Sequence, residues 1–138
     1  MSLTEAQKIV IPIKTDEDVV RLRKQVRDEL IALGLSLIDQ TKMVTAASEL
    51  ARNTLRYGGG GEAHITELIN GTKRGLTLNF IDKGPGIADI SLALTDGYTT
   101  GGGLGLGLSG AKRLADEFNI DTQVGRGTTV TITKWKLF

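Results

Sequence analysis

A chain of 138 residues, 40% hydrophobic and 24% charged, is long enough to bury one core and favours a folded protein over a disordered one. The formal net charge of +1 argues against a general nucleic-acid-binding surface, which needs clustered excess basic charge. The absence of cysteine excludes disulfides, thiolate catalysis and cysteine–zinc sites, and the one histidine, His64, leaves little room for histidine-based metal sites.

The N-terminal part of the chain predicts an edge strand followed by a helix. "KIVIPI" (Lys8–Ile13) is short, β-branched and interrupted by Pro12, as is typical of an edge strand. In "TDED", Thr15 or Asp16 can cap the next helix at its start, and Gly34 is a natural C-cap. The apolar residues between the caps recur at helical spacing and predict the buried face: Val19, Leu22, Val26, Leu30 and Leu33.

A second helix is expected from about Asp39 to Tyr57, after a cap at Ser36 and before the glycine run Gly58–Gly61. Its inward-facing residues should be Val44, Ala47, Leu50, Ala51 and Leu55. Two strands follow, "AHITELI" and "LTLNFID", joined by "NGTKRG", a turn expected to be longer than the two-residue form.

The C-terminal part predicts a helix around Leu106–Phe118 and a closing hairpin made of "IDTQV", the turn "GRG" and "TTVTITKW". This order of elements predicts an α+β fold, a two-layer α/β sandwich whose sheet is mainly antiparallel but mixed, with helices on one face. We see no linker or repeat and expect a single domain over residues 1–138. Without a signal-type N-terminus or an apolar stretch of about 20 residues, a cytoplasmic protein with no membrane and no nucleic-acid partner is expected.

The first candidate for chemistry is a pair of polar residues in "ASELARNTLRYG". Glu49 and Asn53 are four residues apart and therefore share one helix face. A carboxylate and a carboxamide at this spacing can hold a hydrated Mg²⁺ and orient a hydroxyl, because Mg²⁺ prefers few protein oxygens plus waters and phosphates. Taken alone, the pair is more typical of a solvated polar stripe on an amphipathic helix, because such pairs are common.

Two further motifs lie at predicted strand ends. In "DKGPGI", Asp82 can accept a hydrogen bond from an exocyclic amine, while Gly84 and Gly86 allow a tight turn and a close approach of backbone to a ligand. In "GRGTTV", the hydroxyl of Thr128 could reach a base. The alternatives are a simple turn for the first motif and an ordinary β-branched strand residue for the second.

The fourth motif, "TTGGGLGLGLSGAKRL", places bare backbone immediately before a helix. Free N–H groups and the positive end of a helix dipole favour phosphate. The upstream loop, from Ala88 to Gly102, could act as a lid over such a site. The motif lacks the P-loop lysine and is also compatible with a flexible loop.

In this order, the four motifs together resemble the ATP-binding domain shared by DNA gyrase, histidine kinases and MutL, the GHKL superfamily or Bergerat fold. The match spans nearly the whole chain: its N box corresponds to Glu49–Asn53, its G1 box to Asp82–Gly86, its G2 box to Gly101–Gly107 and its last box to Gly127–Thr128. "SELARN", "DKGPGI", "DGYTTGGGLGLGLSGAKRLADEF" and "GTTVTITKW" further resemble the RsbT-like serine/threonine kinases of the anti-sigma regulatory factor family.

The resemblance implies a role for each motif residue. Asn53 would coordinate Mg²⁺ and Glu49 would be the general base, while Asp82 and Thr128 would bind adenine in a pocket shaped by Gly84 and Gly86. The residues expected to meet the ATP phosphates are Gly101, Gly103, Leu104, Gly105 and Gly107. One departure concerns the γ-phosphate, because the lid has no arginine and leaves Lys83, Lys112, Arg52 or Arg56 as the candidate cations.

The resemblance also implies partners. It implies a kinase that phosphorylates a serine or threonine of a STAS-domain protein in a stressosome-type partner-switching pathway and, once released, activates a PP2C-type phosphatase. An alternative is a binding module that uses ATP only as a conformational ligand. The detached catalytic domain of a histidine kinase is a third reading, disfavoured because no phosphoacceptor helix is present. Exposed faces of the first strand and helix could also pair two copies into a homodimer, although no pattern requires it.

Overall fold

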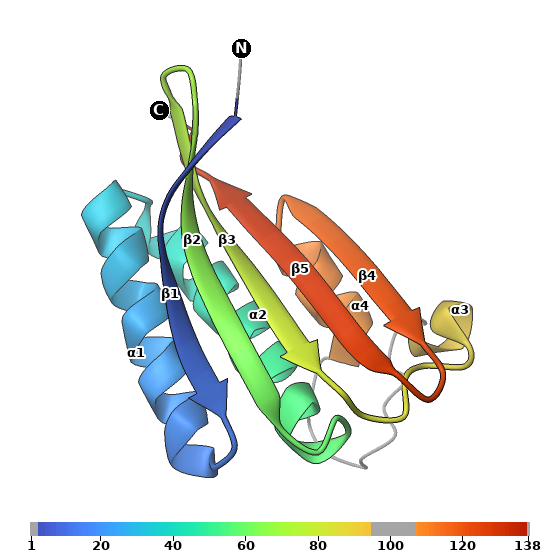
Figure 1. Cartoon of the computed structure of the whole chain (residues 1–138). Coiled ribbons are helices and arrows are strands. Elements are labelled where there is room, and N and C mark those ends of the chain that lie inside the picture. The colour runs from blue at the N-terminus through green and yellow to red at the C-terminus, as the bar shows by residue number, and fades with distance from the viewer. Residues whose placement is uncertain (1–2, 95–106, 138) are drawn as a thin grey trace.

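The computed structural model describes residues 3–94 and 107–137, which form two layers (Figure 1). Five strands make one sheet in the order β1-β2-β3-β5-β4, and every neighbouring pair of these strands is antiparallel. The strands are β1 (Leu3–Ile13), β2 (Gly61–Asn70), β3 (Lys73–Asp82), β4 (Glu117–Gln123) and β5 (Gly127–Trp135). The expected α+β sandwich is confirmed, but the sheet of the described strands is wholly antiparallel rather than mixed.

Three helices cover one face of the sheet, and a short fourth lies beside the end of β4 (Figure 1). They are α1 (Asp16–Leu33), α2 (Leu37–Arg56), α4 (Gly107–Leu114) and the short α3 (Ile90–Ala93). None of the helices in the described part of the chain is long and apolar enough to cross a membrane.

Helix α1 begins and ends as its sequence predicts. The hydroxyl of Thr15 accepts a hydrogen bond from the Asp18 N–H at 3.2 Å, and the Asp18 carboxylate accepts one in return from the Thr15 N–H at 3.1 Å. At the other end, Gly34 adopts φ +82° and donates its N–H to Ile31. The five apolar residues predicted to face inward are all buried.

The same cap gives Asp18 an unusual environment. The N–H of Lys14 donates to its carboxylate at 2.9 Å, and this bond is the largest cause that holds the pKa of Asp18 below its ordinary value. Burial opposes the shift, and the bonds from Thr15 and the charge of Arg21, 2.9 Å away, reinforce it. The cap is therefore stabilised by the ionised carboxylate.

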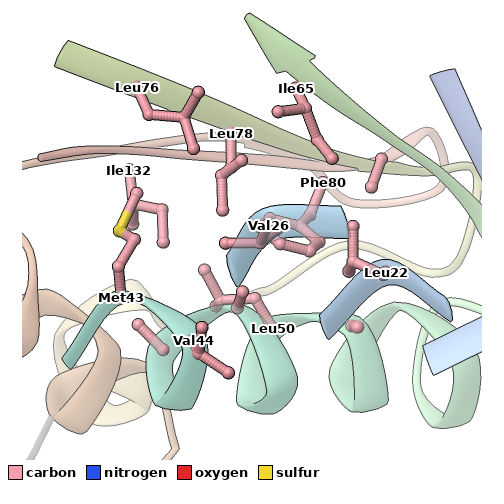
Figure 2. Packing of buried hydrophobic residues seen from close by; sticks show 14 of the residues in the cluster. Leu22, Val26, Met43, Val44, Leu50, Ile65, Leu76, Leu78, Phe80 and Ile132 are labelled. Carbon is pink, nitrogen blue, oxygen red and sulfur yellow. The ribbon is translucent and has the colours of Figure 1, made fainter. Parts of the chain in front are cut away.

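Helix α2 carries its apolar side against the sheet. The Ser36 hydroxyl accepts the Asp39 N–H at 3.1 Å, so the predicted cap is confirmed, although the helix already begins at Leu37. Figure 2 shows Met43 and Leu50 pointing toward the sheet, where Leu78 and Ile132 are fully buried. This packing holds α2 against the sheet.

Several predicted boundaries differ from the structure. The β2–β3 turn has only two loop residues, because Asn70 pairs with Lys73. The helix expected around Leu106–Phe118 ends at Leu114, because Phe118 belongs to β4 and pairs with Ile132. The strand β1 also begins earlier than its apolar core, and it is an edge strand as Pro12 predicts.

Candidate functional site

A cavity of about 430 Å³ opens where the ends of α2 and β3 meet the beginnings of β5 and α4. In Figure 1 this is the end of the sheet beside α3. Of the residues predicted from the motifs, those that line it are Asn53, Asp82, Gly86, Gly107 and Thr128. Motifs spread over 76 positions of sequence, from Asn53 to Thr128, therefore contribute to one pocket.

Apolar side chains for which the sequence predicts no site role form much of the pocket wall. They come from α2, from the inward positions of the sheet, from the segment after β3 and from α4: Leu50, Phe80, Ile87, Leu92, Leu108 and Val130. Their signal in the sequence is indirect, since each is close in the chain to a motif residue. A pocket of this size with apolar walls and a few polar groups is typical of small-molecule sites.

Asp82 is held by two backbone donors. Its Oδ1 accepts the N–H of Gly84 at 2.9 Å and the N–H of Thr128 at 3.3 Å. Oδ2 makes no hydrogen bond to any residue within 3–94 and 107–137, and it lies beside the backbone of Gly58. A Cβ at Gly58 would sit 2.6 Å from Oδ2, so a side chain there would displace the carboxylate. The carboxylate is thus oriented by the backbone with one oxygen left for a ligand.

The loop after Asp82 is fixed to the β4–β5 turn. Gly86 has φ +77°, and a Cβ there would lie 2.3 Å from the carbonyl oxygen of Gln123, so only glycine fits. The carbonyl of Pro85 accepts the Gly125 N–H at 2.8 Å. Gly84, predicted to shape the pocket, does not line it and instead packs against the Gly58 backbone, 2.7 Å from where its Cβ would be.

Thr128 has a partner that no sequence motif indicates, Thr122. Its hydroxyl lies 2.8 Å from that of Thr122, the residue opposite it in the β4–β5 hairpin. The Thr122 oxygen also lies 3.0 Å from the N–H of Ile87 and 3.1 Å from the carbonyl of Gly127. In the sequence, this contact could be found only from the register of the hairpin around "GRG". The motif "GRGTTV" does not include Thr122 and does not give that register.

Glu49 and Asn53 lie one turn apart near the end of α2, as predicted. Glu49 is buried, with 8% of its surface exposed, and does not line the cavity. Asn53 does line it, and its side-chain amide makes no hydrogen bond to another described residue. Within residues 3–94 and 107–137, no cluster of three His, Cys, Asp or Glu side chains could form a metal site. A metal ion in this pocket would be held by Asn53, by water and by oxygen atoms of a bound small molecule.

Of the residues predicted to meet phosphate, Gly107 lies within the described residues. Gly107, at φ +68°, begins α4 and lines the cavity. Four residues predicted to meet phosphate lie outside the described residues: Gly101, Gly103, Leu104 and Gly105. The predicted lid from Ala88 to Gly102 is described up to Leu94 and contains α3, which is capped by Asp89. No Lys or Arg is among the pocket-lining residues in the described ranges.

Comparison with known proteins gives the family. The model of the histidine kinase-, DNA gyrase B- and HSP90-like ATPase family matches residues 38–137. The serine/threonine-protein kinase RsbT of Bacillus subtilis is 42% identical over 125 residues, which cover 91% of this chain and 94% of that protein. This chain belongs to the RsbT-like serine/threonine kinases. The predicted family and enzyme class are therefore confirmed.

Two more distant matches share part of the sequence or the fold. An anti-sigma F factor of Thermoanaerobacter sp. strain X514 is 32% identical over 97 residues, 66% of each chain. A crystal structure of the RsbU and RsbW domains of a Mycobacterium tuberculosis protein superposes with a TM-score of 0.61 and 21% identity. That match covers 94% of this chain but only 32% of the longer one, and it supports the fold alone.

Proposed function

We propose that this RsbT-like chain, acting as a single domain over residues 1–138, binds ATP with Mg²⁺ and transfers its γ-phosphoryl group to a serine or threonine of a STAS-domain partner. The observation that carries the proposal is the convergence of Asp82, Thr128, Asn53 and Gly107 on one pocket. These residues would position the nucleotide and its metal ion, and phosphoryl transfer needs mainly positioning and charge neutralisation rather than covalent chemistry.

The base end of the pocket suits adenine. Oδ2 of Asp82 is an oriented acceptor, and the exocyclic amine of adenine is a donor. The apolar side chains of Leu50, Phe80 and Val130 would pack on the ring. Binding therefore combines apolar contact with one charge-assisted hydrogen bond, which fixes the orientation of the base.

The metal end of the pocket fits Mg²⁺. The Asn53 amide lines the pocket without a described protein partner, and its oxygen can complete an octahedral shell made otherwise of water and phosphate. Mg²⁺ would neutralise phosphate charge there. Glu49, one turn earlier on the same helix, would accept the proton of the attacking hydroxyl. A buried carboxylate on a packed helix has the fixed position that this role needs.

The α4 N-terminus at Gly107 would donate N–H groups to the phosphates. The glycines Gly101, Gly103 and Gly105, with Leu104, are proposed to extend this cradle. Lys83 and Lys112 are exposed and, like Arg52 and Arg56, do not line the pocket. We therefore propose that turnover is slow until a bound partner completes the charge around the γ-phosphate.

The partners are proposed from the relatives. The resemblance to the RsbT-like kinases, together with the RsbT and anti-sigma F factor relatives, supports a STAS-domain substrate, a PP2C-type phosphatase target and a cytoplasmic, stressosome-type setting. The strand β1 lies at the edge of the sheet, and we propose it as the element through which two copies could pair into a homodimer.

An alternative function is an ATP-liganded binding module with little turnover. It is favoured by the absence of Lys and Arg from the described pocket lining and by the anti-sigma relatives. Incubation with radiolabelled ATP, Mg²⁺ and purified STAS-domain proteins separates the two. Acid-stable phosphoserine or phosphothreonine, absent with Glu49→Gln, supports the kinase. Tight ATP binding without transfer to any STAS protein supports the binding module.

A further inference from the structure

We propose that Thr122 is a positioning residue that makes the pocket selective for a purine with an amine, rather than an oxygen, at its sixth position. The proposal rests on the proposed ATP site. Thr122 does not line the pocket and acts through Thr128, which does. It also lies outside all four sequence motifs.

The inference follows from counting protons. A hydroxyl donates one hydrogen bond and accepts up to two. The Thr122 oxygen has three neighbours within bonding distance: the Ile87 N–H at 3.0 Å, the Gly127 carbonyl at 3.1 Å and the Thr128 hydroxyl at 2.8 Å. Ile87 can only donate and the Gly127 carbonyl can only accept. Thr122 therefore gives its proton to Gly127, and all three bonds form only if Thr128 donates to Thr122.

This arrangement fixes the polarity of Thr128. With its proton directed at Thr122, its hydroxyl can offer only lone pairs to the pocket. Asp82, its register partner on β3, offers Oδ2, which is also an acceptor. Two neighbouring acceptors fit the 6-amino group of adenine and repel the 6-oxygen of guanine or hypoxanthine.

Replacing Thr122 with valine would remove this control. The shape of the side chain is kept, but Thr128 loses its acceptor, and its hydroxyl can then rotate and donate to a ligand oxygen. Thr122 also holds the Ile87 N–H, so a general loosening of the loop is a second consequence. The two effects differ in kind, because loosening weakens all purine nucleotides whereas rotation changes the preference among them.

The test is the ratio of the dissociation constants of ITP and ATP, measured by calorimetry on the full chain. ITP has a carbonyl oxygen at the sixth position and a proton on N1, and it otherwise matches ATP; the N1 difference is the same for every variant and cancels when their ratios are compared. We expect Thr122→Val to lower the ratio roughly tenfold, about the value of one neutral hydrogen bond. Thr122→Ser should restore it, and Thr129→Val, the adjacent β5 threonine outside the pocket lining, should leave it unchanged.

A double-mutant cycle guards against a merely structural effect. Thr128→Val removes the hydroxyl that Thr122 is proposed to orient, so adding Thr122→Val to it should change the ratio no further. If Thr122→Val does not fold, Thr128→Val alone tests the proposal, because it removes the hydroxyl whose orientation is proposed to set the ratio of the ITP and ATP dissociation constants. Equal weakening of ATP and ITP by Thr122→Val, with the ratio kept, would overturn the proposal while leaving the ATP site intact. Failure of the unmodified chain to bind ATP would overturn both.

Discussion

Asp82 and Thr128 are register partners on β3 and β5, and the Thr128 N–H donates to Asp82 Oδ1 at 3.3 Å. The bond joins two motifs that are 46 residues apart. It depends on the antiparallel pairing of the two strands, so the sheet itself orients the carboxylate. The other carboxylate oxygen is left for a ligand, which gives the base end of the pocket its proposed specificity.

Asp82→Asn tests that oxygen. An asparagine can keep Oδ1 on its two backbone donors, but an NH₂ group then replaces Oδ2 and faces the adenine amine. We expect ATP affinity to fall by about 2 kcal/mol with the fold intact. Calorimetry with ATP and GTP checks this, with circular dichroism to monitor folding. Unchanged affinity for both nucleotides would remove Asp82 from the base site.

Glu49→Gln tests the proposed general base. The amide has nearly the same shape but cannot accept the proton of a hydroxyl. We expect ATP affinity within about twofold of the unmodified chain and phosphoryl transfer slower by roughly 10²–10⁴-fold. Single-turnover transfer to a STAS-domain substrate measures the rate. Equal transfer rates in the two proteins would contradict the assignment.

Gly86→Ala tests the close approach between the Asp82 loop and the β4–β5 turn. Gly125→Ala is the matched control, because Gly125 has a similar φ of +84° but no atom within 4 Å of a Cβ. Both variants bear the cost of a left-handed alanine, about 1–2 kcal/mol. Only Gly86→Ala adds a contact with Gln123, so it should be the less stable in urea unfolding and the weaker in ATP binding. Equal losses of stability and of ATP affinity in the two variants would contradict the close contact between Gly86 and Gln123.

Asp18→Asn tests the charged cap of α1. Because the folded-state pKa of Asp18 is lowered, its stabilisation is present above its ordinary value of 3.8 and is lost as pH falls through the folded value. At neutral pH the variant should be less stable than the unmodified chain. The difference should shrink below about pH 3.8. Urea unfolding at a series of pH values measures it, and a difference that persists unchanged in acid would contradict the account.

Local signals predicted the helices best. Helix α1 has both caps and a regular apolar stripe, so both of its ends can be predicted from residues in or next to the helix. The sequence predicts that the helix continues through residues 115–118, because the preceding stretch is a helix former. Glu117 and Phe118 instead pair with Thr133 and Ile132 of β5, a contact that the local sequence does not display.

In the candidate site, too, local sequence signals could be predicted and contacts between distant segments could not. Asp82, Asn53 and Thr128 could be selected from motifs, because each lies beside glycines or at a helical spacing that the sequence displays. Thr122 could not, since its role depends on three contacts up to 35 residues apart. The sequence predicts that Gly84 shapes the pocket, because glycine signals close approach, but the approach is to Gly58 rather than to the pocket.

The most direct test of the proposed site is calorimetric titration of the purified chain with ATP, with and without Mg²⁺, alongside Asn53→Ala. The account predicts metal-dependent ATP binding in the unmodified chain and loss of that metal dependence in Asn53→Ala, because the ion loses its one proposed side-chain ligand. Absence of binding at millimolar ATP, or the same metal dependence in both proteins, would contradict it.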